Sequence, residues 1–172
     1  MTAVFSVSNA AALEQFLRKV WALSRALPNA LVGRFEQAVV AISATEREAT
    51  VRQRVGQNLF REGLMTLWGG RCAITGLDVP ELLRASHAKP WADSNDVERL
   101  DVYNGLLLAA HWDAAFDVGL VTVQPDGAVV ASPGLSDAAR AVLGLSDSQR
   151  LKLQPQHTPY LAWHRERVFR AG

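Results

Sequence analysis

The stretch NGLLLAAHWDAAFD, residues 104–117, changes its hydrophobic period half-way along. Its first part, NGLLLA, is a compact apolar run of strand length, and AHWDAAFDVG can form a short helix that ends at Gly119. Asp113 and Asp117 are four residues apart, which puts both carboxylates on one face of that helix. A buried strand that leads directly into a helix with paired carboxylates is therefore the centre of the predicted fold.

A second strand is predicted upstream, and it ends at a histidine. In RASHAKPW, residues 84–91, His87 follows an apolar segment and precedes Pro90, which cannot continue a strand. The polar stretch over residues 88–103 has no clear period, so we expect a long loop between His87 and Asn104. The result is a strand–loop–strand–helix unit that gathers an imidazole, an amide and two carboxylates.

The flanking segments complete an α+β fold. Helices are expected over residues 9–27 with Asn9 as cap, over 30–42, over 43–70, and over 136–145 with Ser136 as cap. A short strand is expected at RCAITG (71–76), a hairpin about QPDG within 120–132, and a helix or extended segment at 158–170. We expect an N-terminal helical segment, residues 1–45, followed by a domain over 46–172 with a basic tail.

Composition narrows the class of protein. The chain has 172 residues, a hydrophobic content of 49% and a net charge of +1, as in ordinary globular proteins. Its one cysteine, Cys72, excludes an intrachain disulfide and a zinc ribbon built from cysteines. We see neither a signal peptide nor an apolar run near the roughly 18 residues of a membrane span, so we expect a cytoplasmic protein with no membrane partner.

The central unit has the groups needed for metal-assisted hydrolysis. A hard divalent cation prefers oxygen ligands, often one or two carboxylates with waters. A neutral histidine beside it could take a proton from water. Together they could promote attack on a phosphodiester.

The motifs RCAITG, SHAKPW and NGLLLAAHWDAAFD together resemble the HNH endonuclease family. The resemblance runs from about Arg52 to Phe169 and is closest to a bacterial restriction-like group that has NGLLL followed by H-x-D-x-x-F-D. It implies a ββα-metal (HNH) nuclease core, cleavage of DNA with a divalent metal ion, and restriction or phage defence as the biological setting.

The resemblance also implies roles for individual residues. His87 would be the general base, and Asn104 would tie down the loop and keep the His87 ring correctly turned. Asp113 would be the principal metal ligand, with His111 and Asp117 as candidate second ligands. The phosphates of DNA would be neutralised by Arg84, Lys89, Arg165, Arg167 and Arg170.

Two departures from the family pattern leave a second reading open. Many relatives have an acidic residue or a histidine where this chain has Ser86, and Asp113 replaces the last motif histidine. Fewer nitrogen ligands favour Mg²⁺ or Mn²⁺ over zinc. The same departures suit a non-catalytic DNA-binding module with a degenerate site.

A third reading places the function in the first 50 residues, as a protein-interaction module. Residues 9–42 contain more apolar surface than a lone helix can leave in water, so we expect them to form a homodimer or to dock on the core. That surface comprises Phe16, Leu17, Val20, Trp21 and Leu27.

Purely structural roles are also open for the site residues. His87 could cap a strand, Asn104 with Gly105 could form a turn, and Asp113 could complement the helix dipole. Asp117 could be a surface charge. We expect packing roles for Cys72, Trp91, Trp112 and Phe116, and surface or phosphate contacts for His157 and His164.

Overall fold

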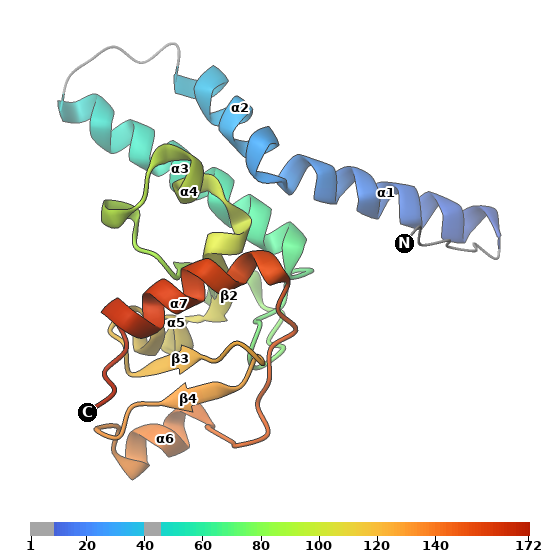
Figure 1. The fold of residues 1–172 in the computed structure, drawn as a ribbon. Coiled ribbons are helices and arrows are strands. Elements are labelled where there is room, and N and C mark those ends of the chain that lie inside the picture. Colours follow the sequence, from blue (N-terminus) through green and yellow to red (C-terminus); the bar gives the residue numbers. More distant parts are fainter. Residues whose placement is uncertain (1–8, 40–45) are drawn as a thin grey trace.

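The described residues form two small antiparallel hairpins, one in the middle of the chain and one nearer its C-terminus, with helices packed around them (Figure 1). The computed structural model describes residues 9–39 and 46–172. The helices found there are α1 (Ala10–Ala26), α2 (Pro28–Val39), α3 (Glu46–Leu67), α4 (Asp96–Leu100), α5 (Ala110–Asp117), α6 (Asp137–Leu143) and α7 (Thr158–Arg167). The strands are β1 (Leu83–His87), β2 (Gly105–Ala109), β3 (Val121–Val123) and β4 (Val129–Ala131). The predicted mixed α+β class is confirmed.

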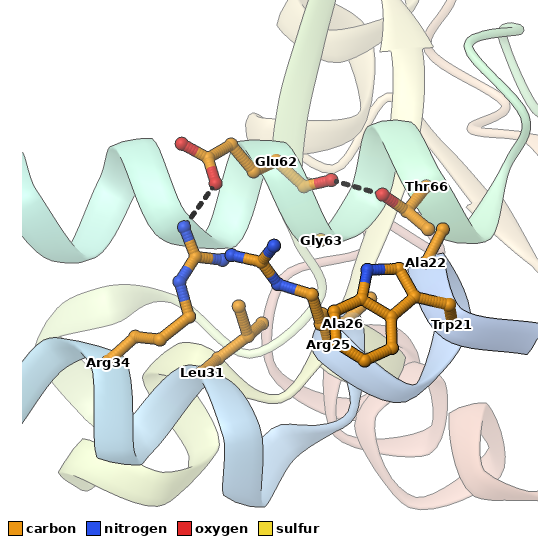
Figure 2. A pocket seen from close by; sticks show the side chains of 9 residues that line it. All are labelled: Trp21, Ala22, Arg25, Ala26, Leu31, Arg34, Glu62, Gly63 and Thr66. Atoms are coloured by element: carbon orange, nitrogen blue, oxygen red, sulfur yellow. Dashed lines mark hydrogen bonds and ion pairs between the residues drawn. The ribbon is translucent and has the colours of Figure 1, made fainter. Parts of the chain in front are cut away.

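The first two helices lie against α3. The side chain of Asn9 accepts a hydrogen bond from the Ala12 amide at 2.9 Å, so the predicted N-cap is confirmed. Arg34 of α2 forms an ion pair with Glu62 of α3, with 2.6 Å between the charged atoms. Figure 2 shows this pair beside Arg25 and Trp21 of α1, in a hollow of about 290 Å³. The expected helix ends at residues 40–45 lie outside the described residues.

The central hairpin is packed between α3 and α5. Strands β1 and β2 pair from Leu83 opposite Ala109 to His87 opposite Gly105. Every residue of β2 is buried, as its apolar run predicts. A Cβ atom at Gly105 would lie 2.4 Å from the Phe60 ring, so glycine is needed for α3 to approach the hairpin this closely.

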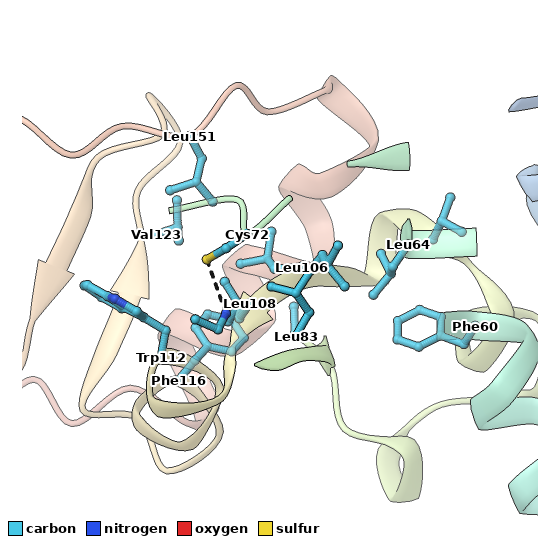
Figure 3. Close-up of a cluster of buried hydrophobic side chains, with 14 of the residues drawn as sticks. Phe60, Leu64, Cys72, Leu83, Leu106, Leu108, Trp112, Phe116, Val123 and Leu151 are labelled. Atoms are coloured by element: carbon cyan, nitrogen blue, oxygen red, sulfur yellow. Dashed lines mark hydrogen bonds between the residues drawn. The ribbon is translucent and has the colours of Figure 1, made fainter. Parts of the chain in front are cut away.

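One continuous hydrophobic core joins α3, both hairpins and α5 (Figure 3). Trp112 and Phe116 of α5 are fully buried in it, which confirms their packing roles. Cys72 is 3% exposed, and its sulfur accepts a hydrogen bond from the Ala109 amide at 3.2 Å. The expected role of Cys72 as a small buried side chain is therefore confirmed.

Two segments differ from the prediction. Residues 71–76 form turns instead of a strand, because the Cys72 amide bonds to Leu77 and the Gly76 amide bonds back to Cys72. The segment expected to be an irregular loop contains α4, which begins with a capping box between Asn95 and Glu98. The predicted hairpin within 120–132 and the Ser136 cap are confirmed.

The described part of the chain, residues 9–39 and 46–172, contains no helix that is long and apolar enough to cross a membrane.

Candidate active site at the end of strand β1

Neighbouring residues at the end of β1 face opposite sides of the hairpin, as strand geometry requires. Ser86 faces α5, where its hydroxyl donates to Asp117 Oδ1 at 3.2 Å. His87 faces α3, where its ring stacks on Phe60 with 3.7 Å between ring centroids. The strand end therefore holds a hydroxyl and carboxylate on one side and an imidazole on the other.

The His87 ring is fixed in one orientation and one tautomer. Its Nε2 atom lies 3.0 Å from the Arg99 carbonyl oxygen, and a carbonyl can only accept, so Nε2 carries the hydrogen. In the neutral ring Nδ1 then keeps its lone pair, and it has no partner among the described residues. Burial lowers the pKa of His87 to about 4, against an opposing effect of the Arg99 carbonyl. The ring is therefore a neutral group with one free acceptor nitrogen.

Asn104 holds the loop that supplies this carbonyl. Its side chain is fully buried, and its Oδ1 accepts from the Lys89 amide at 2.8 Å. Its Nδ2 donates to the carbonyls of Lys89 at 3.1 Å and Glu98 at 3.0 Å. Because Glu98 directly precedes Arg99, these bonds fix the position of the carbonyl that orients His87.

The two carboxylates of α5 are close enough to affect one another. Partial burial raises the pKa of Asp117, and the nearby Asp113 charge raises it further. Partial burial also raises the pKa of Asp113, while hydrogen bonding from Ser86 and the Arg84 charge oppose the rise. A cation bound beside this pair would relieve both the repulsion and the cost of burial.

A hollow of about 380 Å³ lies at the end of β1. Its walls include Ser86, His87 and Asp117, together with Gln57 of α3 and Trp91 of the following loop. Asp113, one turn earlier on α5, is outside the residues that line it. The hollow is thus lined by residues from both sides of the strand end: the imidazole from one side, and the hydroxyl and one carboxylate from the other.

The donors present suit a weakly held hard ion. His111 is exposed and lies two residues before Asp113, on a different face of the helix, so the structure does not bring it to the carboxylate pair. Over residues 9–39 and 46–172, no three His, Cys, Asp or Glu side chains are grouped as a metal site. Carboxylate and hydroxyl oxygens are the ligands that hard divalent cations prefer, usually with several waters retained.

The basic residues proposed for DNA lie in different environments. Arg84 donates to the carbonyls of Glu81 and Leu83, and its charge reaches Asp113. Lys89 is paired with both carboxylate oxygens of Glu98, at 2.8 and 2.7 Å, and so braces the loop.

The tail arginines also differ from one another. Arg165 donates to the Val123 carbonyl at 2.8 Å, which attaches α7 to β3. Arg167 and Arg170 are exposed, without a side-chain partner among the described residues.

His164 belongs to the site and was expected at the surface, which is wrong. It is 1% exposed, stacks on Phe116 at 3.8 Å and also lines the hollow. Its Nε2 lies 3.0 Å from the Phe116 carbonyl, and its Nδ1 lies 2.9 Å from the Thr122 hydroxyl. It therefore fixes the end of α5 next to Asp117.

His157 is buried as well, so its expected surface position is also wrong. Its ring lies edge-on to Trp68 and Tyr103. The basic charges around both histidines suggested a solvated tail. Their burial depends on partners that are distant in sequence.

Residues 72–124 match the HNH endonuclease family. The chain contains an HNH endonuclease domain. The matched segment spans β1, the loop that Asn104 holds, β2, α5 and β3, and so includes every residue proposed above for base and metal. No curated protein matches the chain. The HNH domain indicates a nuclease that acts on nucleic acid, while α3 and α7, which bury His87 and hold α5, lie outside the matched segment.

Proposed function

We propose that the protein is a divalent-metal-dependent endonuclease that hydrolyses phosphodiester bonds in DNA. The observation that carries this proposal is the His87 ring, which is held through Nε2, has no partner for Nδ1 among the described residues, and lines the same hollow as Asp117. A neutral imidazole with a free lone pair is a competent acceptor for a proton from water.

In the proposed reaction, His87 Nδ1 takes a proton from a water in the hollow, and the water oxygen bonds to phosphorus as the P–O3′ bond breaks. Asp117 and Asp113, with the Ser86 hydroxyl, would hold Mg²⁺ or Mn²⁺. When bound, the ion would polarise the phosphate and stabilise charge on the leaving oxygen. Asn104 keeps the Arg99 carbonyl in place, so it positions the base without touching the substrate.

The experiment is cleavage of supercoiled plasmid with magnesium or manganese, compared with EDTA. His87→Ala should lower the rate about 10²- to 10⁴-fold, the usual contribution of a general base, and leave DNA affinity unchanged. Circular dichroism should show the same helix content in both proteins. A variant that cuts at more than a tenth of the wild-type rate would exclude His87 as the base.

The alternative is a non-catalytic DNA-binding module with a degenerate HNH site. It is favoured by Asp113, which replaces the last motif histidine and lies outside the lining of the hollow. DNA binding without cleavage under any divalent ion, and without a calorimetric signal for metal even with DNA present, would support this alternative.

We further propose a cytoplasmic role in restriction or phage defence, and self-association through α1. The single buried cysteine is compatible with a reducing compartment. Leu17, Val20 and Trp21 of α1 are 55%, 45% and 66% exposed, so this helix has an apolar surface available for a second copy.

A further inference from the structure

One stretch of α3 is rich in groups that bind nucleic acid and contains no acidic residue. Residues 51–61, VRQRVGQNLFR, contain three arginines, two glutamines and one asparagine. Five of these side chains are exposed and have no hydrogen-bond or ion-pair partner among the described residues: Arg52, Gln53, Arg54, Gln57 and Asn58. Gln57 already lines the hollow of His87, so this polar surface continues directly into the site.

A second hollow of about 380 Å³ lies beside the first and shares Trp91 with it. The indole is seated on Gly56, where a Cβ atom would lie 2.5 Å from the ring. The Arg99 guanidinium lies over the Trp91 ring, 5.2 Å from the ring centroid. Trp91 therefore lines both hollows, and α3 contributes Gln57 to the first and Gln53 to the second.

The lining of the second hollow combines charge, aromatic surface and an amide. Arg52 provides a guanidinium without a partner among the described residues, while Arg99 is bonded to Asp96, which also lines the hollow, and to the Trp91 carbonyl. Phe35, which is 8% exposed, and Trp91 are its aromatic lining residues, and Gln53 provides one donor and one acceptor group. A cation for phosphate, an aromatic surface for a base and an amide for its edge are what a nucleotide requires.

We propose that this second hollow binds the nucleotide next to the scissile phosphate on the same DNA strand. Arg52 would contact its phosphate, Gln53 the edge of its base, and Trp91 would separate it from the reacting phosphate. The proposal rests on the proposed function, because the strand that enters the hollow of His87 would have to continue past Trp91.

The first test measures binding of a short DNA duplex in EDTA by fluorescence anisotropy over a range of salt concentrations. Arg52→Ala should weaken binding and lower the slope of log K against log salt by about one, the loss of one phosphate contact. Lys19→Ala, an exposed lysine on α1, is the matched control and should leave the slope unchanged. An unchanged slope in Arg52→Ala would overturn the subsite.

The second test separates the subsite from the catalytic proposal. A photo-crosslinking amino acid is placed at Gln53 and, as control, at Val142 of α6, which is 77% exposed. We expect duplex DNA to crosslink at position 53 and not at 142. Crosslinking at 53 by a protein that never cuts DNA would refute the nuclease and leave the second hollow as a DNA-binding site only, whereas cleavage with equal crosslinking at both positions would refute the subsite alone.

Discussion

His87 is enclosed by the Phe60 ring, the perpendicular Trp91 ring and the Arg99 carbonyl. Two of these contacts are apolar, and together they make the protonated ring costly. The third needs an N–H donor, which both the neutral and the protonated ring supply at Nε2. Because the apolar contacts disfavour the charged ring and the carbonyl accepts from either form, the neutral ring is favoured. This is the form that a general base requires before it takes up a proton.

Acid should therefore destabilise the protein through its buried histidines. Burial lowers the pKa of His87 and of His164 to about 4, against an ordinary value of 6.5. Between these values the unfolded chain binds more protons, so the free energy of unfolding is highest above pH 6.5 and falls as pH drops towards 4. Urea unfolding at pH 7 and pH 5 measures this loss, and it should be smaller in His87→Ala. An equal loss in the variant would contradict the burial of this ring.

At the scale of elements, α5 holds a carboxylate pair that is unfavourable without a cation. Asp117→Asn removes one charge from the pair, so we expect a higher melting temperature at pH 7 in EDTA and a smaller rise when magnesium is added. Thermal unfolding with and without magnesium measures both effects, and Asp113→Asn should act in the same direction. Asp147→Asn, an exposed aspartate elsewhere, is the control. A magnesium-induced rise that is unchanged in Asp117→Asn would remove this residue from the metal site.

Helix α7 and the residues after it contain an anchoring arginine, Arg165, and two exposed arginines, Arg167 and Arg170, without a side-chain partner in the described part of the chain. Arg165→Ala should lower the melting temperature because it removes the bond to the Val123 carbonyl. Arg167→Ala with Arg170→Ala should keep the melting temperature and lower the salt slope of DNA binding by about two, one for each phosphate contact. A double variant with unchanged salt dependence would exclude the tail from the DNA interface.

Local sequence signals predicted most elements and part of the site. The period change at residues 104–117 predicted β2 and α5, and the four-residue spacing predicted a shared face for Asp113 and Asp117. The capping box of Asn95 and Glu98 was a readable signal for α4 that the polar composition obscured. Strand alternation separates Ser86 from His87, but which helix covers each face depends on tertiary packing. The partners of His164 lie 42 and 48 residues away, beyond any local pattern.

At the scale of the molecule, α1 extends beyond the body formed by the HNH domain and α3 (Figure 1). We expect the protein to form a dimer through Leu17 and Trp21, which lie four residues apart on the exposed face of α1. Sedimentation should show Leu17→Glu or Trp21→Glu as a monomer with an unchanged melting temperature, while Lys19→Glu stays dimeric. If the wild-type protein is monomeric at high concentration, the dimer is excluded. The remaining role of these helices is then to pack on α3.

The hydrogen bond from the Ala109 amide to the Cys72 sulfur allows local opening of the structure to be measured by thiol labelling. The chain has one thiol, and it is buried where the segment after α3 meets β2. A thiol reagent such as dithiobis-nitrobenzoate can react only after this contact opens, so the labelling rate measures opening of the hairpin. We expect labelling to be slow in buffer and faster in urea. Magnesium and DNA together should make it slower than in buffer alone, because their binding would stabilise the hairpin against opening. Labelling as fast as that of a short cysteine peptide would show that β2 is not held at this point.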